Sequence, residues 1–154
     1  MKLASFRTST GNATYGILEN DRLYDLEIIF PKFPTLKDFI GSPEFVKRNI
    51  PLGTVSFLAE EITFLPVIPN PGKIVCVGLN YGDHIKETGR ADSEYPSLFL
   101  RTNSSQTAHL APLVKPAISE RLDYEGELAL IIGKPGRNIE LGQALIHQRT
   151  ATIR

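Results

Sequence analysis

Alternating apolar and polar positions mark the start of the chain and predict β-strands. Over residues 1–29 the alternation recurs in three segments, with the period of two expected of strands that bury one face. Asn20 and Asp21, both turn-forming residues, separate the second segment from the third. The expected strands are 3–7, 15–18 and 23–26, which together predict a small β-meander.

Two helix-start signals follow the meander. Thr35 stands three residues before Asp38, a spacing typical of a helix N-cap. Ser42, Pro43 and Glu44 supply an N-cap residue, a proline suited to the first helical position and an acidic first turn. These signals predict two short helices, and further strands are expected over 53–57 and 62–65.

A cluster of prolines marks the predicted domain boundary. Pro66, Pro69 and Pro71 lie close together, interleaved with Asn70 and Gly72. Proline removes backbone donors and restricts φ, so this composition favours an extended linker. We therefore expect an amino-terminal lobe over 1–70 and a second domain over 71–154.

Hydrophobic runs also organise the second part of the chain. The expected elements are a buried strand over 74–77, a helix over 80–88 that ends at Gly89, strands over 97–101 and 122–132, and a helix over 140–147. The predicted fold class is α+β, mostly β.

Composition and charge narrow the function classes. The 154 residues are 42% hydrophobic and 22% charged, and 17 basic residues balance 17 acidic ones. This balance provides no field that would attract nucleic acid, and the apolar runs are too short to span a bilayer. The first residues lack a secretory signal, which predicts a cytoplasmic protein. Cys76 lies in an apolar run, where a buried thiol is favoured over a nucleophile.

Three carboxylates recur at alternate positions between Leu122 and Leu128. In a strand, Asp123, Glu125 and Glu127 would share one face and repel one another unless a cation or basic partners were present. Oxygen ligands of this kind suit Mg²⁺, Mn²⁺ or Ca²⁺ better than zinc. The alternative is a solvated face without a ligand.

His84 and Glu87 are spaced for one face of a helix. At three residues apart, Glu87 can accept a hydrogen bond from the His84 imidazole and raise its basicity. A histidine held in this way can act as a general base toward water. The alternative is an exposed pair with no catalytic role.

Three ordered motifs resemble those of the fumarylacetoacetate hydrolase family, in particular its bacterial branch of hydroxymuconate isomerases and acylpyruvases. They extend from Lys73 to His84, from Pro96 to Arg101 and from Leu122 to Lys134, and the similarity continues to about residue 147. The resemblance implies a small amino-terminal β-lobe followed by a mixed β-roll, with homodimers as the usual assembly.

The resemblance also implies a site and a reaction. The family holds Mg²⁺ or Mn²⁺ with two glutamates and one aspartate, and Glu125 and Glu127 match the glutamates. His84 and Glu87 match the pair that activates water on a short mobile helix. The implied substrates are 2-oxo or 1,3-diketo acids such as acylpyruvates, or hydroxymuconate derivatives of aromatic catabolism, which are hydrolysed at a carbon–carbon bond or isomerised.

The chain departs from the family pattern near its last residues. The family continues into a strand that supplies the third ligand, an aspartate, whereas no Asp or Glu follows Glu140 here. We therefore expect a truncated chain with an incomplete β-roll, no third metal ligand and weak or absent metal binding. The alternative function is an inactive remnant or interaction module that dimerises or is completed by a partner.

Arg101 is a further candidate site residue. A guanidinium can bind a substrate carboxylate through two parallel hydrogen bonds. The alternative is a residue at the rim of the site that contacts no substrate.

Overall fold

A five-stranded antiparallel sheet forms the first part of the protein. The computed structural model describes residues 1–47, 49–89, 94–123 and 126–153, with residues 150–153 described by their backbone alone. The strands are β1 (Lys2–Arg7), β2 (Ala13–Glu19), β3 (Arg22–Asp25), β4 (Ser56–Leu58) and β5 (Thr63–Phe64), in the order β4-β3-β2-β1-β5. We call residues 2–68 the sheet region. It confirms the expected meander.

The β2–β3 hairpin closes at Asn20 and Asp21. Both residues have positive φ, 49° and 61°, and the flanking Glu19 and Arg22 pair across the turn. Asparagine and aspartate tolerate this left-handed conformation, which the tightest two-residue hairpin turns require. The predicted turn is confirmed, and it fixes the register of the two strands.

Both predicted helix caps are present. α1 (Leu36–Ile40) begins after Thr35, whose side chain accepts a hydrogen bond from the Asp38 backbone N–H. α2 (Pro43–Lys47) follows Ser42, whose Oγ accepts from the Phe45 N–H at 3.2 Å. Each cap satisfies a backbone donor that a helix start leaves unpaired.

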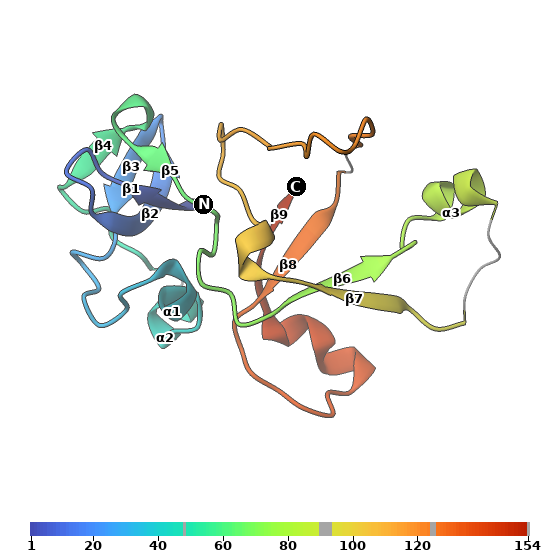
Figure 1. The fold of residues 1–154 in the computed structure, drawn as a ribbon. Helices are drawn as coiled ribbons and strands as arrows, with labels where there is room; N and C mark the ends of the chain where they lie inside the picture. The colour runs from blue at the N-terminus through green and yellow to red at the C-terminus, as the bar shows by residue number, and fades with distance from the viewer. Residues whose placement is uncertain (48, 90–93, 124–125, 154) are drawn as a thin grey trace.

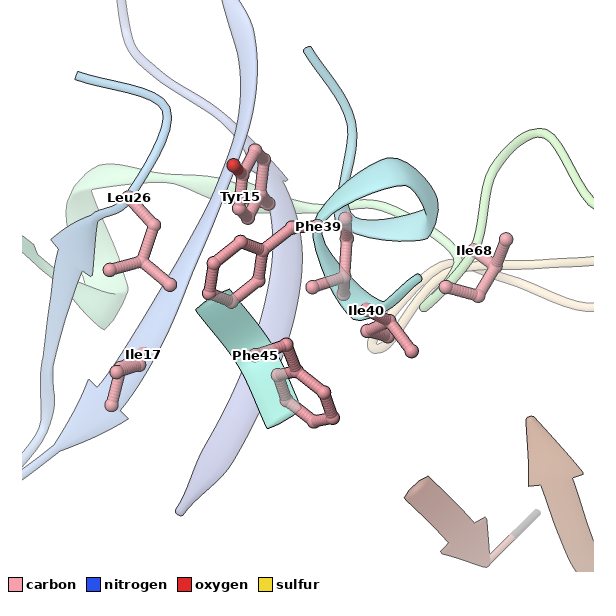
Figure 2. Packing of buried hydrophobic residues seen from close by; sticks show 8 residues of the cluster. Tyr15, Ile17, Leu26, Phe39, Ile40, Phe45 and Ile68 are labelled. Atoms are coloured by element: carbon pink, nitrogen blue, oxygen red, sulfur yellow. The ribbon is translucent and has the colours of Figure 1, made fainter. Parts of the chain in front are cut away.

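The two helices cover the sheet through an aromatic core centred on Phe39. Its ring lies 5.1–6.2 Å, centroid to centroid, from four other aromatic rings, those of Tyr15, Phe30, Phe33 and Phe45. Figure 2 shows Phe39 between strand residues and the two helices, with Ile68 at one side. All buried hydrophobic residues in the described part of the chain lie between Phe6 and Ile68.

The rest of the chain forms two separate two-stranded ribbons. β6 (Ile74–Gly78) pairs with β7 (Ser97–Arg101), and β8 (Leu128–Ile132) pairs with β9 (Gln148–Ile153). We call residues 74–153 the ribbon region. Figure 1 shows the two ribbons beside the sheet region, with α3 (Gly82–Thr88) beyond the far end of β6. Short 3-10 helices occur at Ala59–Glu61, Asn103–Ser105 and Leu141–His147.

One residue of β8 joins the ribbon region to the core of the sheet region. Ile131 packs against that core, and Gly133, just after the strand, approaches Ile40 of α1 so closely that a Cβ would lie 3.0 Å from its Cγ2 atom. The opposite face of β8 bears Leu128, Leu130 and Ile132, which are all exposed. One face of this ribbon is therefore anchored and the other is open.

The strand predicted over 74–77 is present, but the prediction that it is buried is wrong. β6 forms where expected, but Val75 and Val77 are exposed, and so are their β7 partners Leu100 and Leu98. An apolar run predicts a strand covered on both faces, yet in the described part of the chain nothing covers this face of the ribbon. We call these four side chains the aliphatic face.

The predicted strand over 122–132 and helix over 140–147 also need correction. β8 begins only at Leu128, because its register with β9 pairs Leu128 with Ile153 and provides no partner for the described residues before it. The expected shared strand face of Asp123, Glu125 and Glu127 is therefore not formed by the described residues, and Glu125 lies outside them. Leu141–His147 is a 3-10 helix without a buried residue. Where the structure describes the chain, no helix is long and apolar enough to cross a membrane.

Candidate functional site

A cavity of about 410 Å³ lies where the three sequence motifs meet. It opens between the end of β6, the start of α3, the middle of β7 and the segment before β8. Its lining consists of Gly78, Leu79, Asn80, Tyr81, His84, Phe99, Gly126 and Glu127. The structure thus brings two of the predicted site residues, His84 and Glu127, to one cavity.

Leu79 redirects the chain from the strand toward the helix. Its φ of 54° is in the left-handed region, which costs a residue with a Cβ about 1 kcal/mol or more. The turn leads directly to Asn80 and Tyr81 at the cavity, and α3 begins one residue later at Gly82. At its other end α3 stops at Gly89, whose φ of 65° suits glycine, as predicted.

His84 lies on the first turns of α3 and is partly open to solvent. Its Nδ1 atom is 3.8 Å from a carboxylate oxygen of Glu87, and their side chains are 43% and 78% exposed. The distance exceeds that of a hydrogen bond. The two side chains are therefore at ion-pair distance on one face of the helix, as their spacing predicted, but they do not form the predicted hydrogen bond. Their catalytic roles stay a prediction.

α3 depends little on packing. It has seven residues, none of them buried, and its other described ion pair joins Asp83 to Lys86 at 3.1 Å between strongly exposed side chains. Such a short helix is marginal on its own, and exposed pairs add little to its stability. Its position is therefore set mainly by what holds its first residues.

One of these first residues contacts the other side of the cavity. The Tyr81 hydroxyl accepts a hydrogen bond from the backbone N–H of Leu128 at 3.0 Å. Leu128 is the first residue of β8 and follows Glu127 directly. The bond therefore joins the segment that presents His84 to the segment that presents Glu127.

Of the two predicted carboxylates that the structure describes, Asp123 and Glu127, only Glu127 lines the cavity. It is partly buried, Asp123 is exposed, and Glu125 lies outside the described residues. In the ranges the structure describes, no three or more His, Cys, Asp and Glu side chains are grouped so that they could hold a metal ion. The Glu127 oxygens have the right chemistry for Mg²⁺ or Mn²⁺.

Arg101 is not among the residues that line this cavity, although its guanidinium contacts the lining residue Phe99. Arg101 pairs with Ile74, whereas Ser97 pairs with the cavity residue Gly78, so the two pairs are four residues, about 13 Å, apart along the ribbon. The Arg101 guanidinium lies over the ring of Phe99 at 5.6 Å. Its role as a carboxylate anchor stays a prediction. Cys76 is a free thiol of intermediate burial on the same ribbon face as Phe99.

Sequence reasoning did not select four of the lining side chains: Leu79, Asn80, Tyr81 and Phe99. The first three follow a strand directly and precede a helix, a place where loop residues often face a site. Phe99 occupies an alternate position of β7 and looks like an ordinary strand residue. The position of Asn80 and Tyr81 at the end of a strand was the sequence feature that could have indicated them as site residues.

Comparisons with known proteins identify relatives of this chain. Residues 73–148 match the family model for the C-terminal domain of fumarylacetoacetate (FAA) hydrolase. Mitochondrial oxaloacetate tautomerase FAHD2A of Homo sapiens is 39% identical over 94 residues, covering 61% of this chain and 30% of that protein. The Bos taurus protein of the same name is 31% identical over 134 residues, covering 84% and 43%.

A solved structure extends the similarity to almost the whole chain. The fumarylacetoacetate hydrolase from psychrophilic Exiguobacterium antarcticum superposes with a TM-score of 0.74 and 32% identity, covering 99% of this chain and 54% of that one. The chain thus spans from 30% to 54% of the length of these relatives. Its strands and few helices form an α+β, mostly β fold that corresponds to about half of that solved structure.

Proposed function

Because the chain belongs to the fumarylacetoacetate hydrolase family through residues 73–148, we propose that it forms part of an enzyme that hydrolyses or isomerises 2-oxo acids. One observation carries this proposal. A single cavity of about 410 Å³ is lined both by His84, on α3, and by Glu127, in the segment just before β8. A proton acceptor and an oxygen ligand in one cavity suit reactions that pass through an enol or enolate.

In the hydrolytic reaction, His84 takes a proton from water. The oxygen of that water forms a bond to the distal carbonyl carbon of a 1,3-diketo acid such as an acylpyruvate. The bond between this carbon and the neighbouring methylene carbon breaks, and its electron pair forms the enolate of pyruvate. Protonation of the former methylene carbon yields pyruvate and a carboxylic acid, so the atoms of the water end up in the two products.

In the isomerisation, the same base moves a proton between carbon and oxygen. Two relatives are named oxaloacetate tautomerases, a keto–enol interconversion of a 2-oxo diacid. For this chain, His84 would remove the proton beside the carbonyl and a proton would then be placed on oxygen. Both reactions pass through an enol or enolate and use the same base. They differ in whether a carbon–carbon bond or a carbon–hydrogen bond of the substrate is broken.

We further propose Mg²⁺ or Mn²⁺ as the cofactor, held by Glu127 and Glu125. A bound divalent ion polarises the carbonyl and lowers the energy of the developing enolate. Glu127 would contribute an oxygen ligand, because it lines the cavity. Asn80, which also lines the cavity, would orient the substrate's oxygens by hydrogen bonding. A cytoplasmic location belongs to the same proposal and is compatible with the unpaired thiol of Cys76.

The proposal can be tested with a variant of the proposed base, His84, and with a variant of the proposed metal ligand, Glu127. Turnover of oxaloacetate tautomerisation and of acylpyruvate hydrolysis is measured by ultraviolet absorbance, with and without Mg²⁺. His84→Ala should reduce turnover by about 10²-fold or more, while His109→Ala, whose ring packs on Phe64, should leave it unchanged. Unchanged turnover in His84→Ala would show that another group is the base.

Metal binding has an independent measurement. Millimolar Mn²⁺ should raise the melting temperature of the wild-type chain, because a ligand that binds only the folded state stabilises it. Glu127→Gln should remove this shift, while His84→Ala should retain it. A wild-type melting temperature that does not respond to Mn²⁺ would contradict the cofactor assignment.

A second candidate function is an interaction module, favoured by the aliphatic face. Val75, Val77, Leu98 and Leu100 form a continuous apolar surface on paired strands. We propose that the occupant is polypeptide equivalent to the part of the Exiguobacterium antarcticum enzyme that this chain does not match. That polypeptide, added in trans, should bind the wild-type chain and fail to bind Leu98→Asp. A stable dimer of this chain alone that Leu98→Asp dissociates would instead identify a second copy as the occupant.

A further inference from the structure

Tyr81 makes two backbone-directed hydrogen bonds, one at each side of the cavity. Its carbonyl oxygen accepts from the Ile85 N–H at 3.1 Å, in the first turn of α3. Its hydroxyl accepts from the Leu128 N–H at 3.0 Å, 47 residues further along the chain. A single residue therefore connects the start of the helix, through its backbone carbonyl, to the start of β8, through its side chain.

The neighbours of these bonded atoms are the two groups of the proposed reaction. His84 is three residues after Tyr81, within the turn that the Tyr81 carbonyl closes. Glu127 immediately precedes Leu128 and lines the same cavity. A change in the Tyr81–Leu128 distance would therefore change the separation of the imidazole and the carboxylate.

Backbone pairing between the described strands does not fix that separation. β6–β7 and β8–β9 belong to separate sheets, so no backbone ladder spans the cavity. α3 has no buried residue that would anchor it by packing. The Tyr81 hydroxyl, which accepts a hydrogen bond from the first N–H of β8, can hold the two sides of the cavity at a fixed distance.

We infer that Tyr81 is a positioning residue, whose hydroxyl holds the His84 helix at a fixed distance from Glu127. This inference rests on the proposed function of the cavity. The hydroxyl itself takes no part in proton transfer; it acts through the backbone of Leu128. Asn80, although adjacent, makes no such connection in the described hydrogen bonds.

The test removes only the hydroxyl, with Tyr81→Phe, and uses Tyr24→Phe in β3 as the matched control. The first measurement is amide hydrogen exchange at Leu128. Loss of one hydrogen bond worth about 1 kcal/mol should speed exchange about five-fold in Tyr81→Phe. The control should not alter it. An unchanged Leu128 exchange rate overturns the inference.

The second measurement distinguishes positioning from a merely structural bond. Mn²⁺ added to the wild-type chain should broaden the imidazole resonances of His84, because the ion would bind on the Glu127 side of the same cavity. In Tyr81→Phe this broadening should weaken while the Mn²⁺ dissociation constant stays within about two-fold, and kcat should fall more than KM changes. Faster Leu128 exchange with unaltered broadening and kcat would also overturn the inference.

A third measurement separates failure of the inference from failure of the proposed function. If Mn²⁺ has no effect on the wild-type chain, the metal proposal fails, and metal-free spectra decide the role of Tyr81. Glu127→Gln should then shift the His84 imidazole resonances in the wild-type background and shift them less in the Tyr81→Phe background. Equal shifts in both backgrounds would show that the hydroxyl does not couple the two groups.

Discussion

The sheet region and the ribbon region contain similar strands but differ in how they are supported. In the sheet region, five hydrogen-bonded strands and two helices enclose Phe39 and its neighbours. In the ribbon region, pairs of strands present aliphatic side chains to solvent, with Val75 52% and Leu100 71% exposed. Isolated two-stranded ribbons are marginally stable. Burial therefore stabilises the first region, while the second keeps the residues of the candidate site on strands that depend on further contacts.

The largest expected difference between the regions is at their aromatic residues. Phe39→Ala removes a fully buried ring from the core and should lower the free energy of unfolding by about 4 kcal/mol. Phe99→Ala, whose ring is 45% exposed, should lower it by less than about 1 kcal/mol. Urea unfolding followed by circular dichroism measures both values. Equal losses would mean that the ribbon region has a core of its own.

Alanine substitution of one strand glycine in each region should produce a smaller difference in the free energy of unfolding. A Cβ at Gly16 would overlap the carbonyl oxygen of Tyr24 on the neighbouring strand, so Gly16→Ala should cost about 3 kcal/mol of unfolding free energy. At Gly78 the nearest atom would be 3.6 Å away, an ordinary contact. Gly78→Ala should therefore change stability by less than about 1 kcal/mol in the same measurement. A large loss at Gly78 would contradict the open packing of the ribbon.

Tyr15 makes the sheet region sensitive to alkaline pH. Burial raises the pKa of the Tyr15 phenol above its usual value, and the negative charges of Glu27, Asp25 and Asp38 add to the shift. The unfolded chain then loses this proton first. Stability is retained below about pH 10 and should fall above it by about 1.4 kcal/mol per pH unit.

Tyr15→Phe tests this effect and the burial of the hydroxyl together. The Tyr15 hydroxyl has no hydrogen-bond partner among the described residues, so its removal should raise stability at pH 7 by about 1 kcal/mol. The variant should also lose the Tyr15 part of the alkaline decline, whereas Tyr81→Phe should retain it. Unfolding curves at pH 7, 10 and 11 provide the comparison. An identical decline in Tyr15→Phe and wild type would assign it to other groups.

The smallest expected effects are on the aliphatic face. Leu98→Asn and Leu100→Asn replace exposed side chains and should alter the free energy of unfolding by no more than about 0.5 kcal/mol. Leu23→Asn, at a fully buried position of β3, serves as the contrasting variant and should unfold the sheet region. Light scattering should show less non-specific aggregation of the two ribbon variants, because an exposed apolar patch favours aggregation. A strong destabilisation by Leu98→Asn would mean that the face is buried.

Sequence patterns predicted the features that depend on local interactions. The Asn20–Asp21 turn, the Thr35 and Ser42 caps and the Gly89 helix end each follow from one residue's own geometry and its near neighbours. These are interactions within a few positions along the chain, and residue type alone specifies them. The sheet region was therefore largely predictable.

Features that depend on distant partners were not predictable in the same way. β8 begins at Leu128 because of its register with β9, although the apolar alternation suggested an earlier start. Val75 and Val77 are apolar but exposed, since burial depends on a covering layer that the pattern itself does not reveal. At the site, the residue types indicated His84 and Glu127, whereas the Tyr81–Leu128 bond depends on three-dimensional arrangement.

The pairing of β1 with β5 has a consequence for the order of folding during synthesis. Phe6 lies opposite Phe64, so the last strand of the sheet region joins the first only after residue 64 has left the ribosome. Domains generally fold as units as they emerge, with the earlier part first. Every buried residue of that core precedes residue 69 and is therefore synthesised before Ile131, which packs against it. If the sheet region folds as it emerges, the second ribbon is translated onto a surface that is already in place.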